Sequence, residues 1–381
     1  MFSERRPLIL VLLVLCCVHI LALAWREWLP MQGMGAFLYP DGTPVGGDFI
    51  NLWSAGRLAL AGQIDVIYQP DAFMAYQIDF IGAPIGHRVW AYPPHSLFLA
   101  MPFAMLDYYP ALLTWSALGL IVLALGCRRL GFDASETAVA LLSPASVLCL
   151  YYGQTGNLAA GLLLLALSAR PGRDMSAIGA AAMLTIKPQM GFLLPLYWLA
   201  ERRFAAIAAT SALVLAILAL SIWRFGLPAW PAYIRDTLHE LSQLERHGSG
   251  PFMNMIPSIF MALRILTGDG DLAIQLHLLL AVPILAFALW RLWRLDDARR
   301  RIVLVLVSSV LVTPYMHNYD LSILIVAGLL LRRRFDSGSA GEKWAERLAI
   351  AMLVLPQLVV LFNASGWPIS PLLILPLLLL A

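Results

Sequence analysis

Charge is what this sequence has least of. Only 13% of its 381 residues are Asp, Glu, Lys or Arg, whereas soluble domains carry about 25%. Hydrophobic residues make up 60% of the chain, which is more apolar surface than a soluble fold can bury. The runs 7–25 and 211–223 approach or reach the ~20 apolar residues of a spanning helix. The composition therefore excludes a soluble globular protein and predicts an all-α polytopic membrane protein.

Several chemical signatures are also missing. The sequence contains no H-E-x-x-H, no P-loop, no G-x-S-x-G and no dinucleotide-binding fingerprint. Its four cysteines form neither a C-x-x-C knuckle nor a disulfide pattern. We therefore expect no metal and no cofactor, and nothing indicates a nucleic-acid partner. No internal repeat is evident either, so an inverted-repeat transporter is not supported.

Lysine is scarce, with two residues against 24 arginines, and the arginines lie in short clusters. Because basic residues are enriched in cytoplasmic loops, we place every cluster inside: Arg5-Arg6, Arg128-Arg129, Arg170 with Arg173, Arg202-Arg203, Arg291 to Arg301, and Arg332 to Arg334. Between consecutive clusters the chain has to leave the cytoplasm and return. This predicts about twelve membrane segments with both termini inside, in one integral-membrane domain over 1–381.

The intervals between these clusters predict turns on the outer side of the membrane. The turns are 29–96, 151–157, the vicinity of Lys187, 224–270, 313–320 and a last one near 363–368. Residues 29–96 form a first long extracytoplasmic loop, and 224–256 form a second. Residues 332–348 form a polar cytoplasmic connector that contains an amphipathic helix after a Gly/Ser turn.

Several of the predicted segments are too short to cross a bilayer. Residues 175–187 number 13, which is about 20 Å of helix against a hydrocarbon core of ~30 Å. The same holds for 188–201, 302–314 and 321–331. Irregular backbone is tolerated at membrane depth only where it is buried in protein or lines a cavity. The short segments therefore predict an outward-facing cavity.

The first apolar run has two interpretations. The basic start, the apolar stretch and Ala22-Leu23-Ala24 together resemble a signal peptide with its cleavage site. The run is longer than a usual signal core, and the chain that follows is itself membrane. We therefore favour an uncleaved first transmembrane helix.

The first outer loop is acidic and rich in aromatic residues. The spacing of its apolar residues predicts short amphipathic helices that lie at the membrane interface. Five aromatic residues are expected at headgroup level: Trp53, Tyr68, Phe73, Tyr76 and Trp90.

Asp48 follows two glycines just after the first helix, in Gly46-Gly47-Asp48. Glycines let the backbone approach a ligand, and a carboxylate is favoured at a helix start. The side chain therefore has two possible roles, a helix N-cap or a general base at the mouth of a membrane cavity.

Lys187 lies inside an apolar run and precedes Pro188, which breaks the helix. An ammonium group at membrane depth costs at least ~2.5 kcal/mol, so it usually faces a cavity and has a partner. A phosphate at headgroup level would be such a partner. The alternative is that Lys187 extends to the outer interface from a short helix.

Other polar residues fall in the same outer turns. Gln154 and Asn157 share a face if their stretch is helical, or else they cap a helix, and Tyr92 shapes the rim of the cavity with Pro93 and Pro94. His317 and Asp320 bind a phosphate or a sugar hydroxyl, or form a structural pair. We also count Asn254 and Arg264 as candidate substrate ligands, although Arg264 has a simple acidic partner as an alternative. Arg88, Arg235 and His239 have weaker claims.

Asp269-Gly270-Asp271 matches the D-x-D signature of soluble glycosyltransferases that use a metal and a nucleotide sugar. Because the tripeptide precedes an apolar run, a turn with a helix N-cap is the favoured interpretation.

Taken in order, these motifs resemble glycosyltransferase family 87. The similar segments are GGDFINLW, YPPHSLFLAMPF, GQTGNLAAGLL, IKPQMGFLLPLYW and TPYMHNYDLSIL, which together cover roughly 46–330. The family includes α-mannosyltransferases that use polyprenyl-phosphate mannose. The resemblance implies the C-type glycosyltransferase fold, with a catalytic acid at Asp48 and motif residues at Tyr92, Gly153 to Asn157 and Lys187-Pro188. Its late Ser-Pro motif corresponds to Thr313-Pro314 with His317.

We therefore expect an integral plasma-membrane enzyme that moves a mannose-like hexose from a polyprenyl-phosphate sugar to an extracytoplasmic lipid or glycan acceptor. Asp48 would act as the base, the anomeric configuration would invert, and Lys187 would hold the phosphate. A polyprenyl-lipid or sugar transporter or flippase is the alternative, and it predicts polar residues on both sides or internal symmetry. A membrane assembly protein with an inactive site is a third possibility, which the presence of Asp48 and Lys187 disfavours.

Overall fold

A computed structural model describes residues 6–28, 37–39, 41–170 and 172–381 of the protein. Arg5 and residues 29–36, which enter the topology prediction, lie outside the described residues. Within these ranges every regular element is a helix, and an isolated bridge joins Leu38 to Pro44. The prediction of an all-α protein is confirmed.

Five helices of the described chain are long and apolar enough to cross a membrane. They are the span Pro7–Arg26, formed by α1 (Arg6–Leu23) and η1 (Ala24–Trp28), and the helices α6 (Tyr108–Arg129), α13 (Phe204–Phe225), α17 (Gly270–Arg294) and α20 (Ala340–Ala364). The successive helices α7 (Ala134–Leu142) and α8 (Pro144–Tyr151) meet at 49° and make a sixth if they count as one span. Such helices are those of an integral membrane protein.

The segments that the sequence predicts to be short are short helices. They are α10 (Met175–Met183), η4 (Leu184–Ile186), α11 (Pro188–Gly191), α12 (Leu194–Ala200), α18 (Ala298–Val312) and α19 (Ser322–Arg332). Two further short helices, which the sequence did not single out, are α9 (Gly156–Leu167) and α21 (Ser370–Leu380). With 7 residues, α12 rises only about 10 Å. The number of helices that can cross alone is thus five or six, and a count of twelve segments would depend on these short ones.

Helices α9 and α19 form the centre of the fold, since almost all of their side chains are buried. A helix that is apolar all round belongs to a bundle interior. Gly161 of α9 allows close contact with α6, because a Cβ atom there would lie 2.4 Å from the backbone of Val122. Both central helices begin at the same end of the molecule, beside the 152–155 and 318–321 turns.

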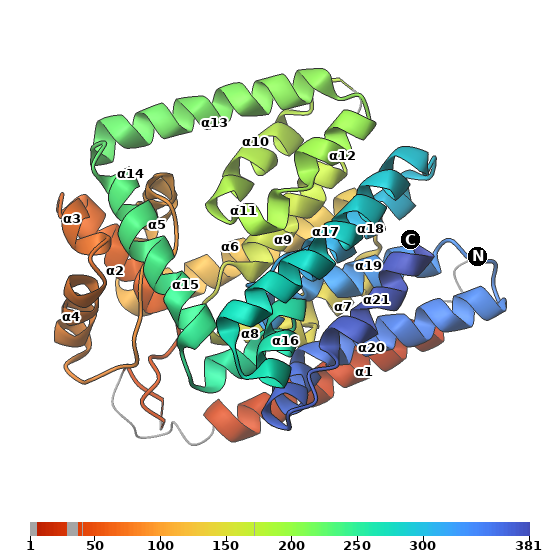
Figure 1. Cartoon of the computed structure of the whole chain (residues 1–381), viewed down its shortest axis with the longest axis horizontal. Helices are drawn as coiled ribbons and strands as arrows, with labels where there is room; N and C mark the ends of the chain where they lie inside the picture. The colour runs from red at the N-terminus through yellow and green to blue at the C-terminus, as the bar shows by residue number, and fades with distance from the viewer. Residues whose placement is uncertain (1–5, 29–36, 40, 171) are drawn as a thin grey trace.

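The predicted first outer loop is largely helical over its described residues, as expected. It contains α2 (Phe49–Leu60), α3 (Ile64–Ile67) and α4 (Pro70–Ile81), followed by an irregular segment and then η3 (Pro94–Ser96) and α5 (Leu97–Ala104). Figure 1 shows α2, α3 and α4 grouped at one side of the bundle. The expectation that its aromatic residues anchor at headgroup level is wrong for Trp53, Tyr68, Phe73 and Trp90. These four side chains are buried inside the protein and form part of its core.

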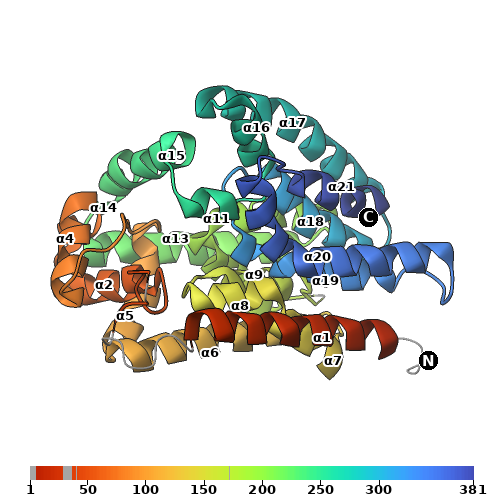
Figure 2. The same ribbon diagram turned by 90° about the horizontal axis from the view of Figure 1, so that it is seen from below.

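The second outer loop is also helical. It contains α14 (Ala229–Ala232), η5 (Tyr233–Thr237), α15 (Leu238–His247) and η6 (Pro251–Met255), and α16 (Ile259–Thr267) follows. Both views place α15 between the first-loop helices and α16 (Figures 1 and 2). His87, from the irregular segment after α4, contacts Glu240 of α15 at 3.2 Å. The two outer loops therefore meet each other.

The predicted cytoplasmic loops also meet one another, at the other end of the bundle. Ion pairs join Arg129 to Asp174, Arg301 to Glu201 and Arg333 to Glu136, and each pair links two different arginine clusters or their neighbours. Within the 332–348 connector, Ser339 caps α20 by accepting a hydrogen bond from the backbone N–H of Glu342, and the helix then continues without a break. These ion pairs hold several of the predicted cytoplasmic loops together.

The Arg333–Glu136 pair gives a test of this packing. Its side chains are 8% and 5% exposed, and removal of one partner from a buried pair costs about 3–5 kcal/mol because the other charge stays uncompensated. We expect Glu136→Gln and Arg333→Gln each to lower the thermal unfolding temperature of the purified protein in detergent. The double variant should be less destabilised than the sum of the two, and strict additivity would contradict the pairing.

Candidate active site

Two glycine-containing turns touch at the end of the bundle where α9 begins. Gly47 has a φ of +51°, and a Cβ atom on it would lie 2.8 Å from the backbone of Tyr152. Gly153 has a φ of +58°, and its Cβ atom would lie 2.3 Å from the carbonyl oxygen of Gly46. The backbone N–H of Asp48 donates to the carbonyl of Tyr152 at 2.8 Å. Glycine is required at these positions because any side chain would force the two turns apart.

This contact directs the Asp48 side chain away from its own helix. Asp48 occupies the N-cap position of α2, but its carboxylate makes no capping hydrogen bond. One oxygen instead accepts from the side-chain amide of Gln154 at 2.5 Å, and the other pairs with the guanidinium group of Arg88. The side chain is 40% exposed. The N-cap interpretation of this carboxylate is therefore wrong, and the group faces an accessible polar site.

Lys187 forms a buried ion pair. Its Nζ atom donates to Oδ1 of Asp320 at 2.6 Å, and the two side chains are 6% and 1% exposed. Lys187 stands between η4 and α11, while Asp320 ends the turn η7 (Asn318–Asp320). Gly156 makes room for the carboxylate, because a Cβ atom there would lie 2.7 Å from Oδ1. Lys187 therefore does not extend to the interface, and its charge is compensated inside the protein.

Tyr92 lies within electrostatic range of both charged pairs. Its hydroxyl shares a hydrogen bond of 2.9 Å with the hydroxyl of Thr155, in the turn that carries Gln154. Burial raises the pKa of Tyr92, and the charges of Lys187, Asp320 and Asp48 also act on that pKa. We call Asp48, Arg88, Tyr92, Gln154, Lys187 and Asp320 the polar cluster. Its members come from five separate parts of the chain.

Aromatic rings border the polar cluster. The ring of Tyr319 lies 5.6 Å from the Nζ atom of Lys187 and stacks on the imidazole of His317 at a centroid distance of 5.0 Å. Burial lowers the pKa of His317 to about 4, although Asp320 acts to raise it. At neutral pH this histidine is therefore uncharged. It can exchange hydrogen bonds with a ligand, but it cannot supply positive charge.

Three predicted ligands have other contacts. The side-chain amide of Asn157 donates to the carbonyl of Ser146 at 3.1 Å. Gln154 lies before α9 begins, so the two residues do not share a helix face. Asn254 accepts from the Asn363 amide through its backbone oxygen. Arg264 donates to the backbone carbonyls of Glu245 and Gly248 and thereby joins the end of α15 to α16. These three contacts support the fold.

The D-x-D tripeptide forms a turn with a helix N-cap, as favoured. Asp269 accepts from the backbone N–H groups of Asp271 and Leu272 at 2.8 and 3.0 Å. The carboxylate of Asp271 pairs with Arg246 at 2.9 Å. Across the described residues, no three His, Cys, Asp or Glu side chains are grouped so that they could hold a metal ion.

Two site residues carried little sequence signal. Arg88 ranked among the weaker candidates because its partner, Asp48, lies on the far side of three helices in the sequence. Glu245 of α15 was not singled out, yet it is 8% exposed and one of its carboxylate oxygens has no hydrogen-bond partner. Burial raises the pKa of Glu245 to about 8, although Arg264 acts to lower it. Glu245 also lies within electrostatic range of Tyr319.

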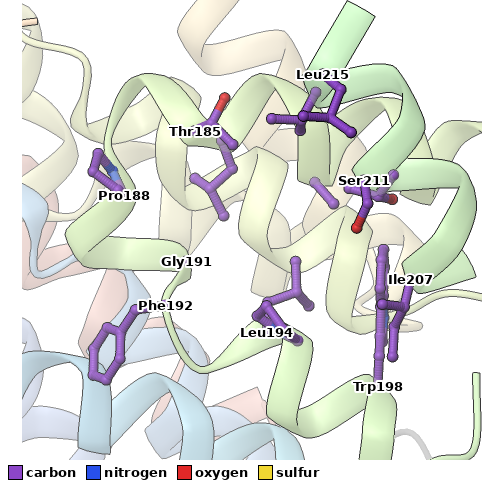
Figure 3. A pocket seen from close by; sticks show the side chains of 14 residues that line it. Thr185, Pro188, Gly191, Phe192, Leu194, Trp198, Ile207, Ser211 and Leu215 are labelled. Atoms are coloured by element: carbon purple, nitrogen blue, oxygen red, sulfur yellow. The ribbon is translucent and has the colours of Figure 1, made fainter. Parts of the chain in front are cut away.

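An apolar cavity of about 500 Å³ lies beside the polar cluster. It lies between the short helices that surround Lys187 and the long helix α13, and it is partly open to the surface (Figure 3). Its walls include Thr185 and Pro188, the near neighbours of Lys187, together with Trp198 and Leu215. The hydroxyl of Thr185 is hydrogen-bonded to His95 at 3.1 Å. The turn at Lys187 therefore separates a charged site from an apolar one.

A family comparison identifies the kind of protein to which this site belongs. The model of glycosyltransferase family 87 matches residues 90–314, more than half of the chain. The chain belongs to glycosyltransferase family 87. Searches of the curated proteins and of the solved structures found no match.

Family 87 membership makes the protein a membrane glycosyltransferase, in agreement with its apolar helices. The matched residues include Tyr92, Gln154 and Lys187 of the polar cluster. Asp48, Arg88 and Asp320 lie outside the match, and their place in the site depends on the contacts described above.

The contact between the glycine turns gives a test of the site. We expect Gly153→Ala to lower sugar transfer by this family 87 enzyme about 100-fold, because a shift of the order of 1 Å at a reacting group has an effect of that size. Gly179→Ala in α10 is the matched control, since a Cβ atom there meets nothing within 4 Å. Transfer by Gly153→Ala within twofold of the unaltered protein would contradict the requirement for glycine.

Proposed function

We propose that this family 87 enzyme moves a mannose-like hexose from a polyprenyl-phosphate sugar to a lipid or glycan acceptor outside the cytoplasm. The observation that carries the proposal is the orientation of Asp48. The carboxylate lies at the start of a helix that it does not cap, is 40% exposed, and has a second, buried charge pair in its surroundings.

Asp48 acts as the general base in this proposal. It takes the proton of the acceptor hydroxyl, whose oxygen attacks the anomeric carbon from the face opposite the phosphate. The bond from the anomeric carbon to the phosphate oxygen breaks with its electron pair, and the configuration inverts. The polyprenyl phosphate leaves with one more negative charge than it had as the diester.

Lys187 stabilises that developing charge. A lysine ammonium group has three N–H donors, and the structure describes one donated to Asp320. Donors held in place where negative charge appears lower the barrier, by about 2.7–4 kcal/mol each in measured cases. Gln154 and Tyr92 orient the donor, and neutral His317 contacts a sugar hydroxyl. Asn157, Asn254 and Arg264 remain outside the substrate site because their contacts hold other parts of the fold.

The lipid chain of the donor occupies the apolar cavity. The cavity begins at Thr185 and Pro188, so a phosphate at Lys187 would present its first isoprene units to these walls. An isoprenoid chain is apolar and already lies in hydrocarbon, so its place in the cavity depends on van der Waals packing against these walls.

The arrangement in the membrane completes the proposal. The polar cluster faces the extracytoplasmic side of the plasma membrane, and the arginine clusters face the cytoplasm. The helix α6 supports this orientation, because its 22 residues span about 33 Å. It begins at Tyr108, whose hydroxyl donates to the carbonyl of Val45 near Asp48, and it ends at Arg129 among the basic clusters. Paired short helices bring the total to about twelve segments in the C-type glycosyltransferase architecture.

A donor panel tests this function. The purified protein is incubated with polyprenyl-phosphate sugars that carry a radioactive sugar, and loss of label from the lipid is measured. We expect turnover with a hexose donor, and we expect Asp48→Asn to reduce it by about 10²–10⁴-fold without loss of expression. Asp79→Asn, an exposed carboxylate of the same loop, is the control. Retained turnover in Asp48→Asn would remove Asp48 from the role of base.

The cavity has its own test. Ser211→Phe fills space between α13 and the short helices around Lys187, and we expect it to raise KM for a long polyprenyl donor about tenfold with little effect on a donor of one isoprene unit. Leu213→Phe adds a ring on α13 outside the cavity walls and serves as the control. An equal effect of Ser211→Phe on both donors would place the lipid chain elsewhere.

A further inference from the structure

The two oxygens of the Asp48 carboxylate are both engaged. Gln154 donates to Oδ2, and Arg88 pairs with Oδ1. A general base has to present a lone pair to the proton that it accepts. In the arrangement described, neither oxygen of the carboxylate is free to accept a proton from an acceptor hydroxyl.

The two charge pairs of the polar cluster differ in how easily they can exchange partners. Lys187 and Asp320 are 6% and 1% exposed, and separation of such a pair leaves a buried charge uncompensated. Arg88 and Asp48 are 13% and 40% exposed. A ligand that enters the site therefore meets the Arg88–Asp48 pair first.

Arg88 also has unused hydrogen-bonding capacity. Its Nε atom is buried and has no hydrogen-bond partner among the described residues. A guanidinium group binds a phosphate with two parallel N–H donors, which carboxylate Oδ1 alone does not engage. Arg88 lies in the irregular segment between α4 and η3, so no helical hydrogen bond has to break when its side chain turns.

We propose that Arg88 exchanges Asp48 for the phosphate of the lipid-linked donor, so that donor binding frees the catalytic base. The proposal rests on the function proposed above. Asp48 keeps its hydrogen bond from Gln154 and turns its released oxygen to the acceptor hydroxyl. The donor consequently binds before the acceptor can be deprotonated, which protects the site from unproductive reaction with an acceptor alone.

The other ionisable groups around Asp48 agree with this exchange. Tyr92, Tyr108, His317 and Tyr319 lie within electrostatic range of its charge. Burial raises the pKa of Tyr92 and of Tyr319 and lowers that of His317. These groups are therefore neutral at pH 7 and do not replace Arg88 as a partner for the carboxylate.

A double-mutant cycle on lipid binding tests the exchange. Polyprenyl phosphate, which carries no sugar, is titrated into the full-length protein in nanodiscs for the unaltered chain, Asp48→Asn, Arg88→Gln and the double variant. Because Asp48 competes with the phosphate for Arg88, we expect Asp48→Asn to tighten binding about tenfold and Arg88→Gln to weaken it about tenfold. In the Arg88→Gln background, Asp48→Asn should change the affinity by less than about twofold.

Two results would overturn the exchange. One is an equal gain from Asp48→Asn in both backgrounds, which would indicate only a general charge effect. The other is no gain from Asp48→Asn in the unaltered background. Arg235→Gln, an exposed arginine that pairs with its neighbour Asp236, is the control and should leave binding unchanged. If Arg88→Gln does not fold, Arg88→Lys takes its place and should retain a smaller share of the coupling.

The outcomes also separate this inference from the function on which it rests. If the unaltered protein binds no polyprenyl phosphate and turns over no polyprenyl-phosphate sugar, both proposals fail. If it binds and turns over the donor but the cycle is additive, the transferase function stands and only the exchange at Arg88 is overturned.

Discussion

The site depends on a backbone contact between two turns that are far apart in the sequence. Gly46 and Gly47 meet Tyr152 and Gly153 so closely that a Cβ atom would not fit between them. This contact brings Asp48 beside Gln154 and away from the cap of its own helix. The buried pair of Lys187 and Asp320 completes the site from the other side, where Gly156 admits the carboxylate. The glycines thus allow the close backbone contacts that shape the site, and the charged side chains lie within it.

The membrane explains why the charges are paired. A charged side chain is costly in an apolar surrounding unless a partner or a cavity receives it. Both cations of the polar cluster accordingly have carboxylate partners, and the arginines at the opposite end bind Asp174, Glu201 and Glu136. A site with balanced charge can then accept an anionic lipid phosphate by exchange of partners.

Much of the fold was accessible from sequence, because apolar composition and arginine position obey simple rules of transfer energy. The short helices, the helical first loop and the role of Asp269 as a cap followed from length, spacing and Gly/Pro position. The partners in the ion pairs could not be predicted from the sequence. Tertiary packing determines the Lys187–Asp320 and Asp48–Arg88 pairs and the burial of Trp53 and Trp90. The local spacing of residues in the sequence carries no information about it.

The most direct test of the account is an experimental structure of the protein with a polyprenyl-phosphate sugar bound. We expect the phosphate between Lys187 and Arg88, the anomeric carbon facing a free oxygen of Asp48, and the isoprenoid chain in the cavity between α11 and α13. A phosphate bound at the arginine-rich end of the bundle, or one that leaves Asp48 more than a hydrogen-bond distance from any acceptor position, would contradict it.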